Sequence, residues 1–187
     1  MTVNTRELIL DAARRTAQAH GYGGLNFRDL AAEVGIKAAS IHYYFPAKAE
    51  LGAAVARRYW EDAAAALDVL SDQTQDPLES LRRYPNMFRK ALENDNRMCL
   101  GSFMAAEYDD LPAPIKKEVQ AFADVNIAWL SRQLAAAALA ASKVNEQKAR
   151  AIFAAIVGAQ LLSRSRADIS VYDSVINIYR TAGLLPE

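Results

Sequence analysis

The chain has 187 residues, 52% of them apolar, which is enough for one ordinary domain or a small domain fused to a medium one. Its 22 Lys and Arg balance 22 Asp and Glu, which excludes a uniformly basic coat for nucleic acid but allows a local basic patch. One cysteine excludes an intrachain disulfide framework, and two histidines add too few soft ligands for a structural zinc site. We therefore expect no metal and no cofactor.

From the N-terminal residues and the hydropathy pattern we expect a cytoplasmic protein. No apolar run approaches the roughly 20 residues of a membrane span. The first residues mix charge into the apolar stretch, unlike a signal peptide. No membrane contact is expected.

Three short helices are predicted at the N-terminus of an all-α protein of about nine helices. Alanine and other apolar residues recur at helical spacing, and no long run alternates as a strand would. We expect these three helices over residues 4–20, 26–34 and 38–44. Gly21 and Gly35 end the first two, because only glycine enters the left-handed region at little cost.

The tight glycine turn between the second and third helices predicts a helix-turn-helix. At 100° per residue, Ile41 and Phe45 share one face of the third helix and pack inward. Ala39, Ser40 and Tyr43 point the opposite way, where small groups and hydroxyls can enter a major groove and bond phosphates or base edges. The alternative is a structural hairpin with exposed rings.

Cations and helix starts around this motif provide further contacts to phosphates. His42, on a flank, either contacts a phosphate when protonated or simply packs. The residues that we expect to contact DNA are Asn26, Phe27, Arg28, Lys37, Ala38, Ala39, Ser40, His42, Tyr43, Tyr44 and Lys48.

The remaining helices follow from breakers and caps. A fourth helix starts at Pro46 and runs to about Leu70. In the polar loop 71–77, Asp76 caps the next helix and Pro77 takes its first position. Pro85 should kink or split that helix. Further helices are expected from about 98 to 107, from 115 to Ala141, from a cap at Asn145 to Ser165, and from 168 to 181, with Gly183 as the stop.

The segment from Ile9 to Leu51 carries a specific set of features: Ile9, Ala12-Ala13, Gly21-Tyr22, Arg28-Asp29-Leu30-Ala31, Gly35-Ile36, Tyr43, Phe45, Lys48 and Leu51. In these it resembles the N-terminal DNA-binding domain of the TetR family of transcriptional regulators. The resemblance implies a helix-turn-helix domain over 1–50 and a helical effector-binding and dimerisation domain over 51–187. The third helix departs from the family at Lys37, where a capping serine is usual. A cation at a helix N-terminus is disfavoured, so we expect Lys37 to touch the DNA backbone.

The last two helices are the candidates for a homodimer interface. The segment 149–165 is apolar nearly all round, and a helix of this kind must be covered on all sides. Two such helices from each subunit could form a four-helix interface, as the resemblance also implies; the alternative is a core within one chain. The expected interface residues are Phe153, Ile156, Val157, Gln160, Leu161, Val171, Val175 and Ile178.

Large apolar groups gather in the middle of the chain, where the resemblance implies a small-molecule pocket. The same stripe of methionines and rings is also typical of plain core. The candidate ligand contacts are Trp60, Tyr84, Met87, Phe88, Cys99, Phe103, Met104, Tyr108, Phe122, Asn126 and Trp129.

Together these features predict a transcriptional repressor that a small, mainly hydrophobic ligand releases from a palindromic operator on double-stranded DNA. One alternative is a redox-responsive repressor using Cys99, against which stands an inert, buried cysteine. Another is a helical DNA-binding or adaptor protein that senses nothing. An enzyme is disfavoured, because the sequence has no nucleophile–base pair, HExxH, P-loop or dinucleotide motif.

Overall fold

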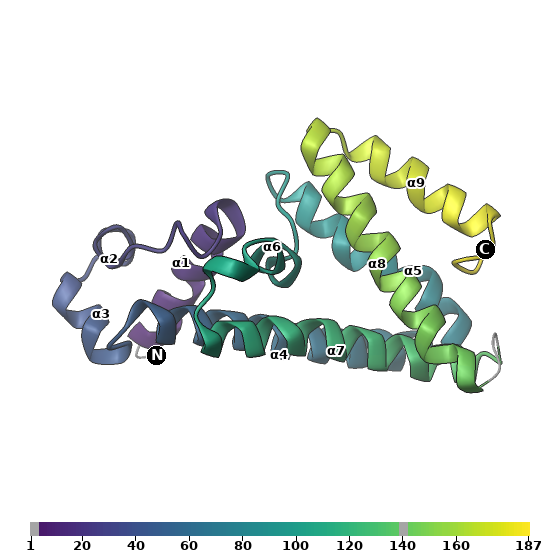
Figure 1. Cartoon of the computed structure of the whole chain (residues 1–187), viewed down its shortest axis with the longest axis horizontal. Coiled ribbons are helices and arrows are strands. Elements are labelled where there is room, and N and C mark those ends of the chain that lie inside the picture. The colour runs from purple at the N-terminus through teal and green to yellow at the C-terminus, as the bar shows by residue number, and fades with distance from the viewer. Residues whose placement is uncertain (1–3, 139–141) are drawn as a thin grey trace. The chain divides into compact units, whose positions relative to one another are not determined.

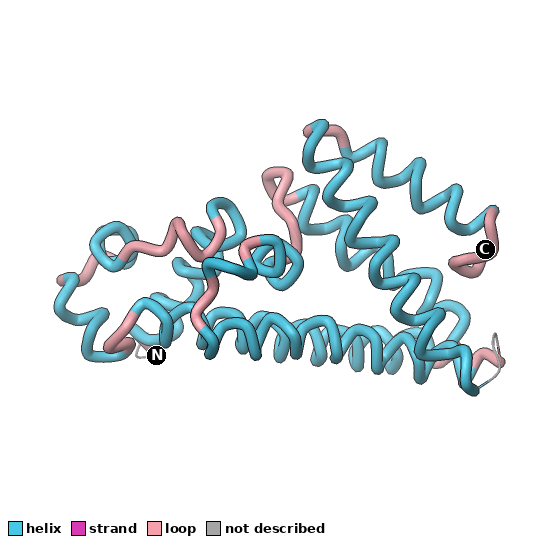
Figure 2. The backbone as a smooth tube through the Cα atoms, in the orientation of Figure 1, coloured by secondary structure: helices cyan, strands magenta, loops and turns pink. Residues whose placement is uncertain are grey.

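The computed structural model describes residues 4–138 and 142–187, and all regular structure in them is helical (Figures 1 and 2). This confirms the predicted all-α fold. The elements are α1 (Thr5–His20), α2 (Phe27–Val34), α3 (Ala38–Tyr44), α4 (Lys48–Thr74), α5 (Pro77–Glu93), α6 (Leu100–Ala106), the 3-10 turn η1 (Tyr108–Asp110), α7 (Ala113–Ala136), α8 (Ser142–Arg166) and α9 (Ile169–Thr181).

The helices form two compact units. Unit 1 combines the chain up to Asp62 with Leu100–Phe122, and unit 2 combines Ala63–Cys99 with the chain from Ala123 onward. Since α4 and α7 both pass from one unit into the other, each supplies side chains to two separate cores.

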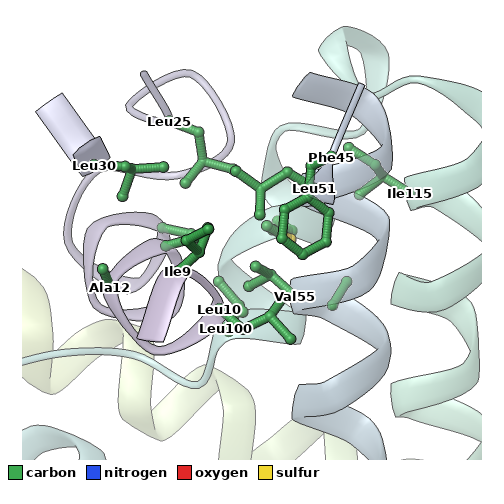
Figure 3. Close-up of a cluster of buried hydrophobic side chains, with 14 of the residues drawn as sticks. Ile9, Leu10, Ala12, Leu25, Leu30, Phe45, Leu51, Val55, Leu100 and Ile115 are labelled. Atoms are coloured by element: carbon green, nitrogen blue, oxygen red, sulfur yellow. The ribbon is translucent and has the colours of Figure 1, made fainter. Parts of the chain in front are cut away.

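The core of unit 1 is built from α1, α2, α3, the first half of α4, α6 and the start of α7. Figure 3 shows its side chains converging from helices that lie far apart in the sequence. Each fully buried Leu or Ile stabilises the unit by roughly 1.5–3 kcal/mol. The buried residues include Ile9, Leu10, Leu25, Leu30, Ile41, Phe45, Leu51, Val55, Leu100, Met104 and Ile115.

The core of unit 2 is built around α5, which packs against α8 and α9, while α8 and α9 pack on each other. On α5 the buried residues recur at helical spacing, and Asp76 caps the helix by accepting the Leu78 N–H at 2.9 Å. The main buried residues are Leu81, Tyr84, Phe88, Trp129, Leu130, Leu134, Ile152, Ile156, Tyr172 and Ile176.

Two predicted helix limits around α4 are wrong. The helix begins at Lys48, so Pro46 lies in the bend before it, and it continues to Thr74 through residues predicted as loop. The hydroxyls of Ser71 and Thr74 donate to the carbonyls of Leu67 and Leu70, at 3.1 and 3.0 Å. These bonds satisfy the polar side chains inside the helix, which is why the polar composition did not end it.

The structure also bears on three other predictions about helix boundaries and breaks. Pro85 lies inside one continuous α5, which it does not split. The helix α7 ends at Ala136, and the predicted end at Ala141 falls outside the described residues. Asn145 is not a cap, because α8 already begins at Ser142 and buries Asn145 in its first turns. In contrast, α9 spans nearly its predicted range, and Asp168 caps it by accepting the Ser170 N–H at 2.9 Å.

Candidate nucleic-acid interface

The turn between α2 and α3 is fixed by local bonds. Asn26 caps α2 by accepting the Arg28 N–H at 2.8 Å. Gly35 follows α2 at φ 76° in the left-handed region, and the Ile36 N–H returns to the Ala31 carbonyl at 3.0 Å. This short turn lets α3 leave α2 at once, the geometry of a helix-turn-helix.

One face of α3 anchors the helix and the other is free. Ile41 is fully buried and Phe45 is 3% exposed, as the 100° step predicts. Tyr43, on the opposite side, is 83% exposed, and Ala38, Ala39 and His42 are also exposed. Ser40 and Tyr44 are half-buried. The free face therefore offers methyl groups, a hydroxyl and a phenol to an external surface.

The cations predicted to meet phosphates differ in how they are held. Arg28 and Lys37 are exposed, and the Lys37 side chain makes no capping bond to α3. Lys48 is half-buried: its Nζ donates to the Gly23 carbonyl at 3.1 Å and lies 4.7 Å above the Tyr22 ring. Lys48 thus has a fixed place beside the α1–α2 turn.

Two aromatic residues predicted to contact DNA make contacts within the helix-turn-helix. The half-buried ring of Phe27 meets His42 edge-on with centroids 4.7 Å apart. His42 Nδ1 lies 3.4 Å from the Pro46 carbonyl. Both side chains therefore link α2, α3 and the bend before α4, and their contact with DNA stays a prediction.

Sequence reasoning missed a buried carboxylate, Glu118 on α7. It accepts Arg57 Nη2 at 2.7 Å and Trp60 Nε1 at 2.8 Å, both from α4, and its side chain is 6% exposed. The hydrogen bond from Arg57 holds the pKa of Glu118 below its usual range, against the opposing effect of burial. These bonds fasten α7 to α4 within unit 1.

The predicted effector contacts divide between the two units. Unit 1 contains Trp60, Phe103, Met104, Tyr108 and Phe122, and unit 2 contains Tyr84, Met87, Phe88, Cys99, Asn126 and Trp129. In unit 1, Met104 and Phe122 are buried in packing, whereas Tyr108 is 46% exposed and lies 4.3 Å beneath the Lys116 ammonium.

Unit 2 brings four of its six candidates into one cluster. The Tyr84 ring stacks on Trp129 with centroids 5.3 Å apart and meets Phe88 edge-on at 5.4 Å. The Tyr84 hydroxyl donates to Asn126 Oδ1 at 2.8 Å, and burial raises the pKa of Tyr84 well above its usual range. Trp129 Nε1 donates to the Ser71 hydroxyl at 3.0 Å. The cluster is apolar with a few fixed polar groups, the make-up of a ligand pocket and equally of a satisfied core.

The other two candidates of unit 2 are Met87 and Cys99. Met87 is half-buried and lines a surface groove of about 580 Å³ between α4 and α5. Cys99 is buried, and its backbone N–H donates to Gln160 Oε1 at 3.0 Å. Burial is what the inert reading of this cysteine expects.

The predicted dimer residues are buried to different degrees within their own chain. Ile156 and Gln160 are fully buried, and Gln160 Nε2 donates to the Phe88 carbonyl at 2.8 Å. Leu161 is 56% and Ile178 is 60% exposed. The intermediate residues are Phe153, Val157, Val171 and Val175. One side of α8 and α9 thus belongs to the core, and the other remains uncovered in the subunit.

The described residues lack both a helix able to span a membrane and a cluster able to hold a metal ion. None of their helices combines the length and the apolar character that crossing a membrane requires. They also contain no group of three or more His, Cys, Asp or Glu side chains arranged to hold a metal ion.

A helix-turn-helix whose second helix presents a free face defines a DNA-binding protein. A family model described as "Bacterial regulatory proteins, tetR family" matches residues 9–55, the segment that contains this motif. Residues 9–55 thus carry a DNA-binding domain of the TetR family, as the sequence resemblance indicated, and this match supports a DNA-binding transcriptional regulator.

Solved structures with a similar fold match nearly the whole chain. A TetR transcriptional regulator from Legionella pneumophila is 29% identical with a TM-score of 0.90, over 97% of this chain and 99% of that one. A TetR-family regulator from Agrobacterium tumefaciens is 26% identical with a TM-score of 0.85, over 91% and 93%. A TetR protein from Rhodobacter sphaeroides, 20% identical with a TM-score of 0.85 over 96% and 97%, shows the fold alone. No curated protein matches the sequence.

Proposed function

We propose that this regulator is a repressor that binds a palindromic operator as a homodimer and leaves it when a small, mainly hydrophobic ligand binds. In this proposal residues 1–50 read DNA, and residues 51–187 bind the effector and form the dimer. The observation that carries it is the free face of α3, on which Tyr43 is 83% exposed while Ile41, two residues away, is fully buried.

The reading of DNA follows from this face. The Ala38 and Ala39 methyl groups let α3 lie deep in a major groove, and the Ser40 and Tyr43 hydroxyls can bond base edges or phosphates. Lys37 at the start of α3 supplies charge for the backbone. Through these contacts, the exposed side of α3 distinguishes one DNA sequence from another.

A dimer follows from the small size of the motif. One seven-residue helix reads too few base pairs to specify an operator, and a two-fold dimer places two such helices on two half-sites. The uncovered sides of α8 and α9 support this arrangement, since Leu161 and Ile178 are apolar and more than half exposed. Gly158 leaves open space where a Cβ would lie, which suits close helix approach.

Release by an effector requires that the ligand bind one of two conformations more tightly. The Tyr84–Trp129–Phe88 cluster with Asn126 supports a mainly hydrophobic ligand, because stacked rings and one polar pair favour flat, apolar molecules. A ligand there would replace the Tyr84–Asn126 bond with its own. Burial of Cys99 favours such an effector over an oxidant as the signal.

The test begins with selection of bound duplexes from random DNA by the purified full chain. The proposal expects a two-fold symmetric sequence, and Tyr43→Ala should lose preference for it while the protein stays folded. Compounds are then screened for release of the best duplex, with Trp129→Ala expected to abolish release and not binding. Recovery of sequences without symmetry, or release by peroxide that Cys99→Ser prevents, would contradict the proposal.

A further inference from the structure

The turn between α1 and α2 is held by a carboxylate from far along the chain. Within the turn, the Gly24 N–H donates to the His20 carbonyl at 3.3 Å and the Leu25 N–H to the Tyr22 carbonyl at 3.2 Å. The Tyr22 N–H instead donates to Glu107 Oε2 at 2.8 Å. Glu107 directly follows α6, 85 positions later, and belongs to the same unit.

The approach of this carboxylate depends on Gly21. A Cβ at this position would lie 2.1 Å from Glu107 Oε1, far inside any contact distance. Gly21 also has φ 69°, which L side chains rarely adopt. The glycine therefore serves two purposes at once: it ends α1 and it leaves the space that Glu107 fills.

The same turn fixes Lys48, the first residue of α4. Its Nζ donates to the Gly23 carbonyl at 3.1 Å and lies 4.7 Å above the Tyr22 ring. The ring in turn lies against Gly52, where a Cβ would be 3.0 Å from it. The Lys48 ammonium is thus positioned by the two residues that follow Gly21, one of which Glu107 holds.

We propose that Glu107 is a positioning residue for DNA binding. By accepting the Tyr22 N–H it fixes the α1–α2 turn, and the turn keeps the Lys48 ammonium where it neutralises a DNA phosphate. The inference rests on the proposed contact of Lys48 with DNA. Glu107 itself does not touch DNA and acts only through the turn.

The direction in which removal of Glu107 changes DNA affinity distinguishes a positioning role from simple charge repulsion. A carboxylate on the DNA-binding unit repels phosphates, so its removal should by itself strengthen binding, at low salt above all. If Glu107 positions Lys48, its removal weakens binding instead, and it does so by loss of one phosphate contact in each subunit. The two accounts therefore predict opposite changes for the same substitution.

The experiment measures the affinity of the full chain for the duplex recovered by selection, as a function of salt concentration. Glu107→Ala should lower the affinity several-fold and reduce the salt slope of the dimer by about 1.8, the value for one phosphate contact in each of the two subunits. Glu107→Asp keeps the charge but is too short to reach the turn, so it should lose the same contact. Glu107→Gln keeps an acceptor oxygen and should keep the original slope.

Asp109→Ala is the matched control, because it removes the same charge from an exposed carboxylate on the adjacent η1 turn. It should leave the affinity unchanged or raise it. Lys48→Ala should reduce the slope as Glu107→Ala does, and the double variant should lose no more than Lys48→Ala alone, because both remove one contact.

The outcomes are distinguishable. Unchanged or tighter binding by both Glu107→Ala and Glu107→Asp, together with a reduced slope for Lys48→Ala, overturns the role of Glu107 but keeps the contact of Lys48. An unchanged slope for Lys48→Ala overturns that contact and the inference with it. Additive losses in the double variant also overturn it. If Glu107→Ala unfolds by circular dichroism, Glu107→Asp decides the question.

Discussion

Two substitutions two residues apart on α3 should have opposite effects on stability and on DNA binding. Ile41→Ala empties a position that is fully buried in the core of unit 1, whereas Tyr43→Ala shortens a side chain that is 83% exposed. The two residues share one short helix and its caps, so propensity and helix length are nearly the same in both variants.

The expected magnitudes follow from burial. Ile41→Ala removes three carbon atoms at about 0.8 kcal/mol each and leaves a cavity, for a total of roughly 2–5 kcal/mol. At about 2–4 °C per kcal/mol for a chain of this size, the melting temperature falls by several degrees or more. Tyr43→Ala stays within about 0.5 kcal/mol, as exposed substitutions do. It should instead cost about 1–3 kcal/mol in operator binding, if it loses a base contact.

The assay pairs thermal unfolding by circular dichroism with fluorescence anisotropy on the selected duplex at one fixed salt concentration. Each variant is measured at a temperature where Ile41→Ala remains folded. The reasoning is refuted if Tyr43→Ala destabilises the protein as much as Ile41→Ala, because the ring then packs inside. It is equally refuted if Tyr43→Ala binds the duplex and random DNA with unchanged affinities.

Three further predictions concern single contacts. Lys37→Ala should weaken operator binding and lower its salt slope by about 1.8, one phosphate contact from each subunit of the dimer, as measured by titration at several salt concentrations. Leu161→Lys should yield monomers in analytical ultracentrifugation without unfolding the subunit, while Val69→Lys, which changes an equally exposed apolar residue on α4, should leave the dimer intact. Glu118→Gln should reduce the loss of folding stability in acid, because the pKa of Glu118 is lowered in the folded state. The ionised Glu118 contributes fully to stability above about pH 4.3, and this contribution is lost as the pH falls through the lowered pKa. Chemical denaturation between pH 2 and 7 tests this, and equal pH dependence in both proteins would contradict it.

The helix-turn-helix could be predicted because its determinants are local. Asn26 bonds an N–H two residues away, and Gly35 ends α2 through its own φ of 76°. The inward and outward faces of α3 follow from 100° per residue alone, and both were placed correctly at Ile41 and Tyr43. Interactions of this range are visible in a sequence, since no other part of the chain is needed to satisfy them.

Glu107 and Glu118 were missed because their partners are distant. Glu107 meets Tyr22 across 85 positions, and Glu118 meets Arg57 across 61. In sequence each resembles any solvated glutamate near a helix end. The end of α4 was placed too early for a related reason: Thr74 is satisfied partly within the helix and partly by the Ser80 hydroxyl at 2.6 Å, from the next helix.

For the predicted effector contacts, the sequence pattern does not distinguish a ligand pocket from a packed core. Their prediction rests on size and apolar character, and a packed core demands the same side chains as a hydrophobic pocket. Their division between two units could not be foreseen, because α4 and α7 each run through both. A buried polar pair is more informative than a ring, since a ligand that breaks the Tyr84–Asn126 hydrogen bond has to replace it. A molecule that supplies both a donor and an acceptor could replace that bond at little cost, whereas a purely apolar one would leave two buried polar groups with one partner fewer. The chemistry of the pair therefore favours, among hydrophobic effectors, those that carry at least one polar group.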